Sequence, residues 1–179
     1  MLENYHRRSV RLKRYNYASV GAYFITICTH HRIGCLGHID EGNVSLTWQG
    51  QIVKEEWLKT ADIRQGVVMG DFCIMPNHLH GIIMLSESDE GTRQRTPTKY
   101  EKFGKPNINS IPTIIRSFKS VATTRINGVR NRPHQPIWQR GYYEHVIRNE
   151  EELRSIQEYI INNPLQWSMD RYYLSSFTE

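Results

Sequence analysis

The 179-residue chain is predicted to form one α+β domain built on a ferredoxin-like antiparallel sheet. Strand-like and helix-like segments alternate in the order β-α-β-β-α-β, and one further helix follows them. The length suits a single domain, and the sequence shows neither an internal repeat nor a second block of secondary structure. We therefore expect a four-stranded sheet with both crossover helices on one face and the last helix outside that unit.

The first half of the chain is expected to supply three strands and one helix. Residues 21–29 are dense in aromatic and β-branched side chains, which favours a strand. Thr47 is expected to cap a helix that runs to about Asp62, because apolar residues recur there at helical spacing. Residues 66–75 form or bracket a second strand. A Pro-Asn turn then leads into an apolar third strand that ends at Leu85.

The second half is expected to supply two helices and the fourth strand. Ser110 is placed to cap a helix with a proline in its first turn and an apolar stripe that reaches Ile126. Residues 142–147 are expected to form the fourth strand. The final helix is expected to begin at Glu150 and to end at Pro164, because the residue before a proline avoids the α conformation.

Composition divides the chain into three parts. Residues 1–20 read as a basic N-terminal arm and residues 21–179 as the single domain. Within that domain, residues 86–109 are polar, basic and punctuated by Gly and Pro, with no periodicity. Loops of this length in a compact domain are usually functional or disordered, and we expect a basic insertion here.

The positive charge of the chain is concentrated in two segments. Between Gly91 and Arg140 there are 11 Lys or Arg residues and one acid, and a second basic block lies near the N-terminus. Such segregation indicates a polyanionic partner such as nucleic acid, although a solvated loop and arm would give the same pattern. The candidate DNA-binding residues are Arg7, Arg8, Arg11, Arg14, Arg116, Lys119 and Arg125.

Several classes of protein are not favoured by the sequence. No stretch approaches the roughly 18 apolar residues of a membrane span, and the N-terminus lacks the apolar block of a signal peptide, so we expect a cytoplasmic protein. The three cysteines are odd in number and show no CxxC spacing, which predicts neither a zinc knuckle nor a disulfide framework.

Two histidines in the third predicted strand are the strongest functional signal. His78 and His80 are two residues apart in an apolar segment, so their side chains project from the same face of the strand. Two neutral imidazoles beside an open coordination position suit a catalytic metal, whereas a pair of core histidines bonded to the backbone is the alternative.

A tyrosine and an asparagine on the last predicted helix form a second candidate pair. Tyr159 and Asn163 are four residues apart and therefore share one side of that helix, at the edge of its apolar stripe. The tyrosine hydroxyl is a candidate nucleophile and the asparagine amide oxygen a candidate third metal ligand. Ordinary packing of the ring, and an ordinary helix-ending Asn-Pro pair, are the alternatives.

Three separated motifs resemble the REP-associated tyrosine transposases and their single-tyrosine HUH relatives. They are Pro76-Asn-His-Leu-His, Trp138-Gln-x-Gly-Tyr-Tyr-Glu-His-Val-Ile-Arg148 and Tyr159-Ile-x-x-Asn-Pro164. The resemblance implies a nuclease domain that acts on single-stranded or hairpin DNA with Mg²⁺ or Mn²⁺. It assigns the metal to His78, His80 and Asn163, and the nucleophile that forms a 5′-phosphotyrosine to Tyr159. Relatives in this family act as monomers or as homodimers.

Two other functions compete with this interpretation. A catalytically idle nucleic-acid-binding module on the same fold would use the basic segments and leave the histidines structural. A metal hydrolase for small molecules would use the histidines and leave the segregated charge unexplained. Formation of a denaturation-resistant adduct with single-stranded DNA distinguishes the strand transferase from both.

Overall fold

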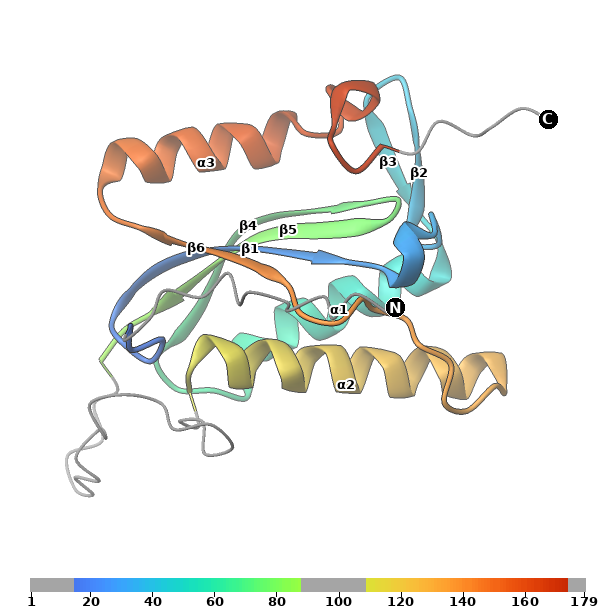
Figure 1. The fold of residues 1–179 in the computed structure, drawn as a ribbon, viewed down its shortest axis with the longest axis horizontal. Helices are drawn as coiled ribbons and strands as arrows, with labels where there is room; N and C mark the ends of the chain where they lie inside the picture. The colour runs from blue at the N-terminus through green and yellow to red at the C-terminus, as the bar shows by residue number, and fades with distance from the viewer. Residues whose placement is uncertain (1–14, 88–108, 174–179) are drawn as a thin grey trace, which may run out of the picture.

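The computed structural model of the chain describes residues 15–87 and 109–173. Its central feature is a four-stranded antiparallel sheet in the order β4-β5-β1-β6. The helices α1 and α2 cover one face of this sheet, and α3 lies over the other face (Figure 1). The predicted ferredoxin-like α+β fold is therefore confirmed. The elements of this unit are β1 (Gly21–Cys28), α1 (Trp48–Asp62), β4 (Val67–Met75), β5 (His78–Leu85), α2 (Ile111–Arg130), β6 (Tyr143–Ile147) and α3 (Glu150–Asn162).

The helix starts follow local capping chemistry to different degrees. Thr47 caps α1 as predicted, because its Oγ1 accepts the Gly50 N–H at 3.2 Å. Ser110 precedes α2 as predicted, but its side chain does not cap the helix; its hydroxyl instead donates to Thr113 Oγ1 at 3.2 Å. The helix α3 has a cap that was not predicted, in which Asn149 Oδ1 accepts the Glu152 N–H at 2.8 Å.

A small hairpin between β1 and α1 was not predicted from the sequence. It consists of β2 (Gly37–Asp40) and β3 (Asn43–Leu46), which pair only with each other. Each strand has four residues with few β-branched side chains, so neither stands out from a loop by composition. The turn between them passes through Glu41 and Gly42, both at positive φ.

The alternation of side chains in β1 and β5 separates two cores. The odd-numbered residues of both strands, such as Ile25 and Leu79, pack with α1 and α2 in the main hydrophobic cluster. Phe24 and Ile82 point to the opposite face, where they pack with Ile160 of α3. His78 and His80 have the parity of Ile82, so the sheet delivers both imidazoles to the face that α3 covers.

The predicted division of the chain into arm, domain and insertion is not tested by the described residues. Residues 1–14, which carry Arg7, Arg8, Arg11 and Arg14, lie outside them, as does most of the predicted insertion at 86–109. The arm and the insertion therefore stay predictions. Within the described part of the chain, no helix combines the length and the apolar character that crossing a membrane requires.

Gly81 is required where β5 passes under α1. A Cβ atom added there would lie 2.5 Å from Trp57 Cζ2 and 3.2 Å from Phe72 Cβ, and the Trp57 indole is fully buried. The absence of a side chain lets Trp57 pack directly against the strand that carries the two histidines.

Gly81→Ala is accordingly expected to lower the free energy of unfolding by about 1–3 kcal/mol, the usual cost of overpacking a core. Gly128 of α2 is the matched control, because a Cβ there meets nothing within 4 Å. Gly128→Ala should raise the stability by up to about 1 kcal/mol through helix propensity. Urea unfolding followed by tryptophan fluorescence measures both changes, and equal stability of the two variants would contradict the packing argument.

Candidate active site

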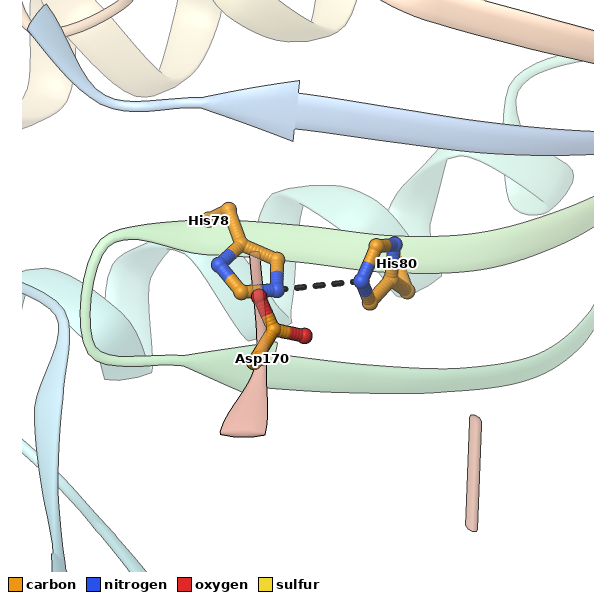
Figure 2. A group of neighbouring side chains, drawn as sticks. All are labelled: His78, His80 and Asp170. Atoms are coloured by element: carbon orange, nitrogen blue, oxygen red, sulfur yellow. Dashed lines mark hydrogen bonds between the residues drawn. The ribbon is translucent and has the colours of Figure 1, made fainter. Parts of the chain in front are cut away.

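The two histidines predicted from the sequence face each other at the start of β5. Both side chains are buried, and their Nε2 atoms lie 3.0 Å apart (Figure 2). Burial lowers the pKa of each imidazole below its ordinary value, so both are neutral near pH 7. The result is a pair of neutral nitrogen donors at one point on the face of the sheet.

Asn77 fixes the orientation and tautomer of His78. The Asn77 Nδ2 donates to the Tyr172 carbonyl oxygen at 2.8 Å, which leaves its Oδ1 facing His78 Nδ1 at 2.8 Å. An amide oxygen only accepts, so Nδ1 of His78 carries the proton and donates it. The Nε2 lone pair of His78 therefore faces His80 Nε2, and it can bind a cation that takes the place of this contact.

Thr26 supports His80 from the neighbouring strand. The register of β1 and β5 places Thr26 opposite His80, and the Thr26 Oγ1 lies 2.8 Å from His80 Nδ1. A hydroxyl can donate or accept, so this contact is compatible with either tautomer of His80. When His80 carries its proton on Nε2, the Thr26 hydroxyl donates to Nδ1. When Nε2 instead binds a metal, the proton is on Nδ1 and the Thr26 hydroxyl accepts the hydrogen bond. Such second contacts orient the ligands of a metal centre.

A carboxylate that the sequence did not predict completes the cluster. After α3 the chain forms a short turn, η2 (Trp167–Met169), and then returns to β5, bringing Asp170 beside the two imidazoles (Figure 2). The ligand atoms of His78, His80 and Asp170 all lie within 4.8 Å of one another. These three side chains form a possible metal-binding group.

Asn163, the predicted third ligand, lies next to this carboxylate. Its Nδ2 donates to Asp170 Oδ2 at 3.0 Å, and its Oδ1 is buried with no hydrogen-bond partner among the described residues. A buried amide oxygen without a partner is costly unless a cation or water satisfies it. Two imidazoles, one carboxylate and one orphaned amide oxygen form a donor set that fits a divalent cation.

Tyr159 extends from α3 to the same cluster. Its hydroxyl lies 3.1 Å from His80 Nε2, and its ring meets the edge of Phe24, with 6.0 Å between the ring centroids. The side chain remains 38% exposed. Burial, reinforced by the negative charge of Asp170, raises the pKa of Tyr159 to about 12, while the Arg171 guanidinium acts in the opposite direction.

Two more residues of the last segment surround the cluster, and neither was predicted from the sequence to lie beside the histidines. The Tyr172 ring packs on His78 with 4.6 Å between centroids. The exposed Arg171 lies with its Cζ 4.7 Å from the Tyr172 ring centroid and 5.5 Å from that of Tyr143. The only signal in the sequence is an Asp-Arg pair between aromatic residues after the last helix.

The three cations predicted on α2 occupy different environments, and α2 lies across the sheet from α3 (Figure 1). Arg116 is exposed. The Lys119 ammonium donates to the Gln139 and Gly141 carbonyl oxygens at 2.7 and 2.9 Å, and burial lowers its pKa to about 8. Arg125 forms ion pairs with Glu55 and Glu56 of α1 at 2.8 and 2.5 Å. Lys119 and Arg125 therefore have partners within the protein, which a count of charges does not reveal.

Comparison with known proteins gives two relatives in Haemophilus influenzae. An uncharacterized protein is 40% identical over 174 residues, which cover 95% of this chain and 94% of that protein. A second protein, provisionally named a REP-associated tyrosine transposase, is 30% identical over 95 residues. This second match covers 52% of the chain and 47% of the relative, so it spans about half of each. No protein-family model matches the chain.

The fold has a counterpart among solved structures. A REP-associated tyrosine transposase bound to a REP hairpin superposes with a TM-score of 0.61 at 21% identity, over 91% of this chain and 77% of that one. This likeness concerns the fold. The chain is thus similar to REP-associated tyrosine transposases in its fold and, over about half of its length, in its sequence.

Proposed function

We propose that the chain is a metal-dependent strand transferase for single-stranded DNA that uses Tyr159 as its nucleophile. The observation that carries the proposal is the contact of 3.1 Å between the Tyr159 hydroxyl and His80 Nε2, at the edge of the cluster of His78, His80 and Asp170. The relative named as a transposase, and the solved transposase with its bound hairpin, support a transposase-like activity on DNA.

The proposed metal would be held by His78, His80 and Asp170, with Asn163 as a further oxygen donor. When bound, a divalent cation supplies charge that polarises the scissile phosphate. Mg²⁺ prefers oxygen ligands and retains several waters, whereas Mn²⁺ accepts imidazole more readily. Two of the candidate ligands are imidazoles, which favours Mn²⁺ over Mg²⁺ in affinity.

The chemistry we assign to Tyr159 is a transesterification. Its phenolic oxygen attacks the phosphorus and forms a 5′-phosphotyrosine, the bond from phosphorus to the 3′-oxygen breaks, and that oxygen leaves as a 3′-hydroxyl after gaining a proton. The number of phosphate ester bonds is unchanged, so the free 3′-hydroxyl of another strand can reverse the step and rejoin the DNA. Direct hydrolysis by water would lose this bond.

The surroundings of Tyr159 create an electrostatic problem that Arg171 is placed to reduce. The hydroxyl must lose its proton during attack, but burial and the Asp170 carboxylate both raise its pKa. The Arg171 guanidinium opposes this shift. Because Arg171 is exposed beside the cluster, we assign it a second role, binding the phosphate whose negative charge grows during attack.

The proposed substrate is a single strand next to a DNA hairpin. A duplex does not readily present its backbone to a recessed tyrosine, whereas an unpaired strand can bend into the site. The basic N-terminal arm and Arg116 are the proposed sources of nonspecific attraction. We do not assign Lys119 and Arg125 to DNA binding, because both side chains already have partners within the protein.

Tyr159→Phe is expected to abolish the covalent adduct with single-stranded DNA while leaving stability and DNA affinity nearly unchanged, because only one hydroxyl is removed. The measurement is a denaturing gel of labelled DNA incubated with protein and Mn²⁺. Tyr173→Phe is the matched control, since that ring is exposed and packs on Trp167, and it should retain the adduct. If the Tyr159→Phe variant still forms the adduct, Tyr159 is not the nucleophile, and the next candidates are Tyr142, Tyr143, Tyr172 and Tyr173.

Metal binding can be tested without any DNA. The double variant with His78→Ala and His80→Ala should lose Mn²⁺ binding in calorimetry. Asp170→Asn, which keeps the shape and removes the charge, should weaken binding by about tenfold or more. Asn163→Ala should weaken it less, because a neutral amide is the weakest donor of the set. Unchanged Mn²⁺ affinity in the double histidine variant would return both residues to a structural role.

DNA affinity is expected to fall steeply with salt, with a slope of roughly −3 or steeper in log K against log salt, at about −0.7 per neutralised phosphate for single strands. Deleting residues 1–14 should make the slope shallower. Arg116→Gln should also make the slope shallower, by about 0.7. Arg125→Gln changes the net charge equally on the same helix and should leave the slope unaltered. Equal effects of the two substitutions would indicate a general charge effect in place of a contact.

A further inference from the structure

A groove lies beside the metal-binding group, between β6 and the first two turns of α3. Its volume is about 600 Å³, within the range of about 300–1,000 Å³ that is usual for small-molecule sites. None of the roles assigned above uses it. The residues that matter for its chemistry are Phe24, Tyr143, His145, Arg148, Glu152 and Ser155.

One wall of the groove is aromatic. The Tyr143 ring is 39% exposed and packs edge to face with Phe24, with 6.3 Å between ring centroids. The Arg171 guanidinium lies over this ring, 5.5 Å from its centroid, so the open part of the ring offers a stacking platform beside a cation. Every nucleobase has a π face, and stacking on an aromatic side chain is the common way to hold an unpaired base.

The α3 wall of the groove presents the Glu152 carboxylate as a fixed hydrogen-bond acceptor. Glu152 Oε1 lies 2.6 Å from His145 Nε2, and Glu152 Oε2 accepts the Arg148 backbone N–H at 2.7 Å. These two contacts, the backbone one first, lower the pKa of Glu152 and keep it ionised. Each carboxylate oxygen of Glu152 retains further lone-pair capacity, so this wall can accept a hydrogen bond from a bound group.

The groove adjoins the nucleophile through a shared ring. Phe24 lines the groove, stacks on His80 with 5.3 Å between centroids and meets the Tyr159 ring at 6.0 Å. Ser155, also in the groove, precedes Tyr159 by one helical turn and so lies on the same side of α3. A strand whose phosphate lies at Tyr159 would therefore have its neighbouring nucleotide within reach of the groove.

We propose that this groove holds one unpaired nucleotide of the DNA strand, next to the phosphate at Tyr159. The base stacks on Tyr143 and points its amino group at the Glu152 carboxylate, while the Arg148 side chain is near its phosphate. The acceptor-rich wall favours adenine, cytosine or guanine, which carry an exocyclic amino group, over thymine, which does not. This inference rests on the proposed function, because it assumes a DNA strand at Tyr159.

The test measures DNA binding in the Tyr159→Phe protein, so that no strand is cut. A series of short single-stranded oligonucleotides, each with one abasic position, is titrated by fluorescence anisotropy. One position should be sensitive, and removal of its base should weaken binding about tenfold, within the range for stacking of a base on an aromatic ring. Introducing Tyr143→Ala should abolish the sensitivity at that position, whereas Tyr143→Phe should preserve it.

A second arm tests the acceptor wall and the source of the nucleotide. Thymine at the sensitive position should bind more weakly than the other bases, and Glu152→Gln should narrow the difference because its amide can donate to thymine O4. A deoxynucleoside monophosphate at millimolar concentration should not displace the oligonucleotide. Displacement at micromolar concentration would assign the groove to a free nucleotide and overturn the proposal.

The proposal also fails if no position is sensitive, or if Tyr143→Ala leaves the sensitivity unchanged while its urea unfolding midpoint matches that of the parent. These results are independent of the nucleophile. The adduct assay with unaltered Tyr159 reports on the proposed function, and it can succeed or fail whether or not the groove binds a base.

Discussion

The antiparallel register of β1 and β5 is the constraint on which the site depends. It places Thr26 opposite His80 and Cys28 opposite His78, and it directs both imidazoles to the face under α3. A shift of one residue would turn every side chain of β5 to the other face and bury the imidazoles under α1 and α2. The apolar residues of β5 oppose such a shift, because Leu79, Ile83 and Leu85 would lose the main core. The packing that stabilises the fold therefore also fixes the ligand geometry.

The parts of the site that the sequence predicts are those with a local pattern. Alternation in a strand places His78 beside His80, and helical spacing places Tyr159 above Asn163. Asp170 has no such pattern, since about 90 residues separate it from His80 and only the path of the chain after α3 brings the two together. The β2–β3 hairpin escaped prediction because its strands are short and weakly biased. Charge counting likewise could not show that Lys119 and Arg125 have protein partners.

The last described segment gives the site two opposing charges. Asp170 adds a negative charge that attracts a cation but makes Tyr159 harder to ionise, and the next residue, Arg171, acts against that effect. Placing both groups on consecutive residues makes them depend on one backbone conformation. The aromatic contacts of Tyr172 with His78, Arg171 and Arg32 hold that conformation against the sheet. The pKa of Tyr159 is thus linked to the docking of a short segment of chain.

The Asn77 side chain links His78 of β5 to Tyr172 of the last described segment. Its amide nitrogen donates to the Tyr172 carbonyl, and its oxygen accepts from His78. In magnetic resonance terms, the two side-chain amide protons of Asn77 form a built-in probe. They should exchange slowly with solvent while the segment is docked and rapidly if it is displaced, and their chemical shifts should respond to protonation of the imidazole. A single buried amide would therefore report the state of His78 and the position of Tyr172 in one pair of resonances.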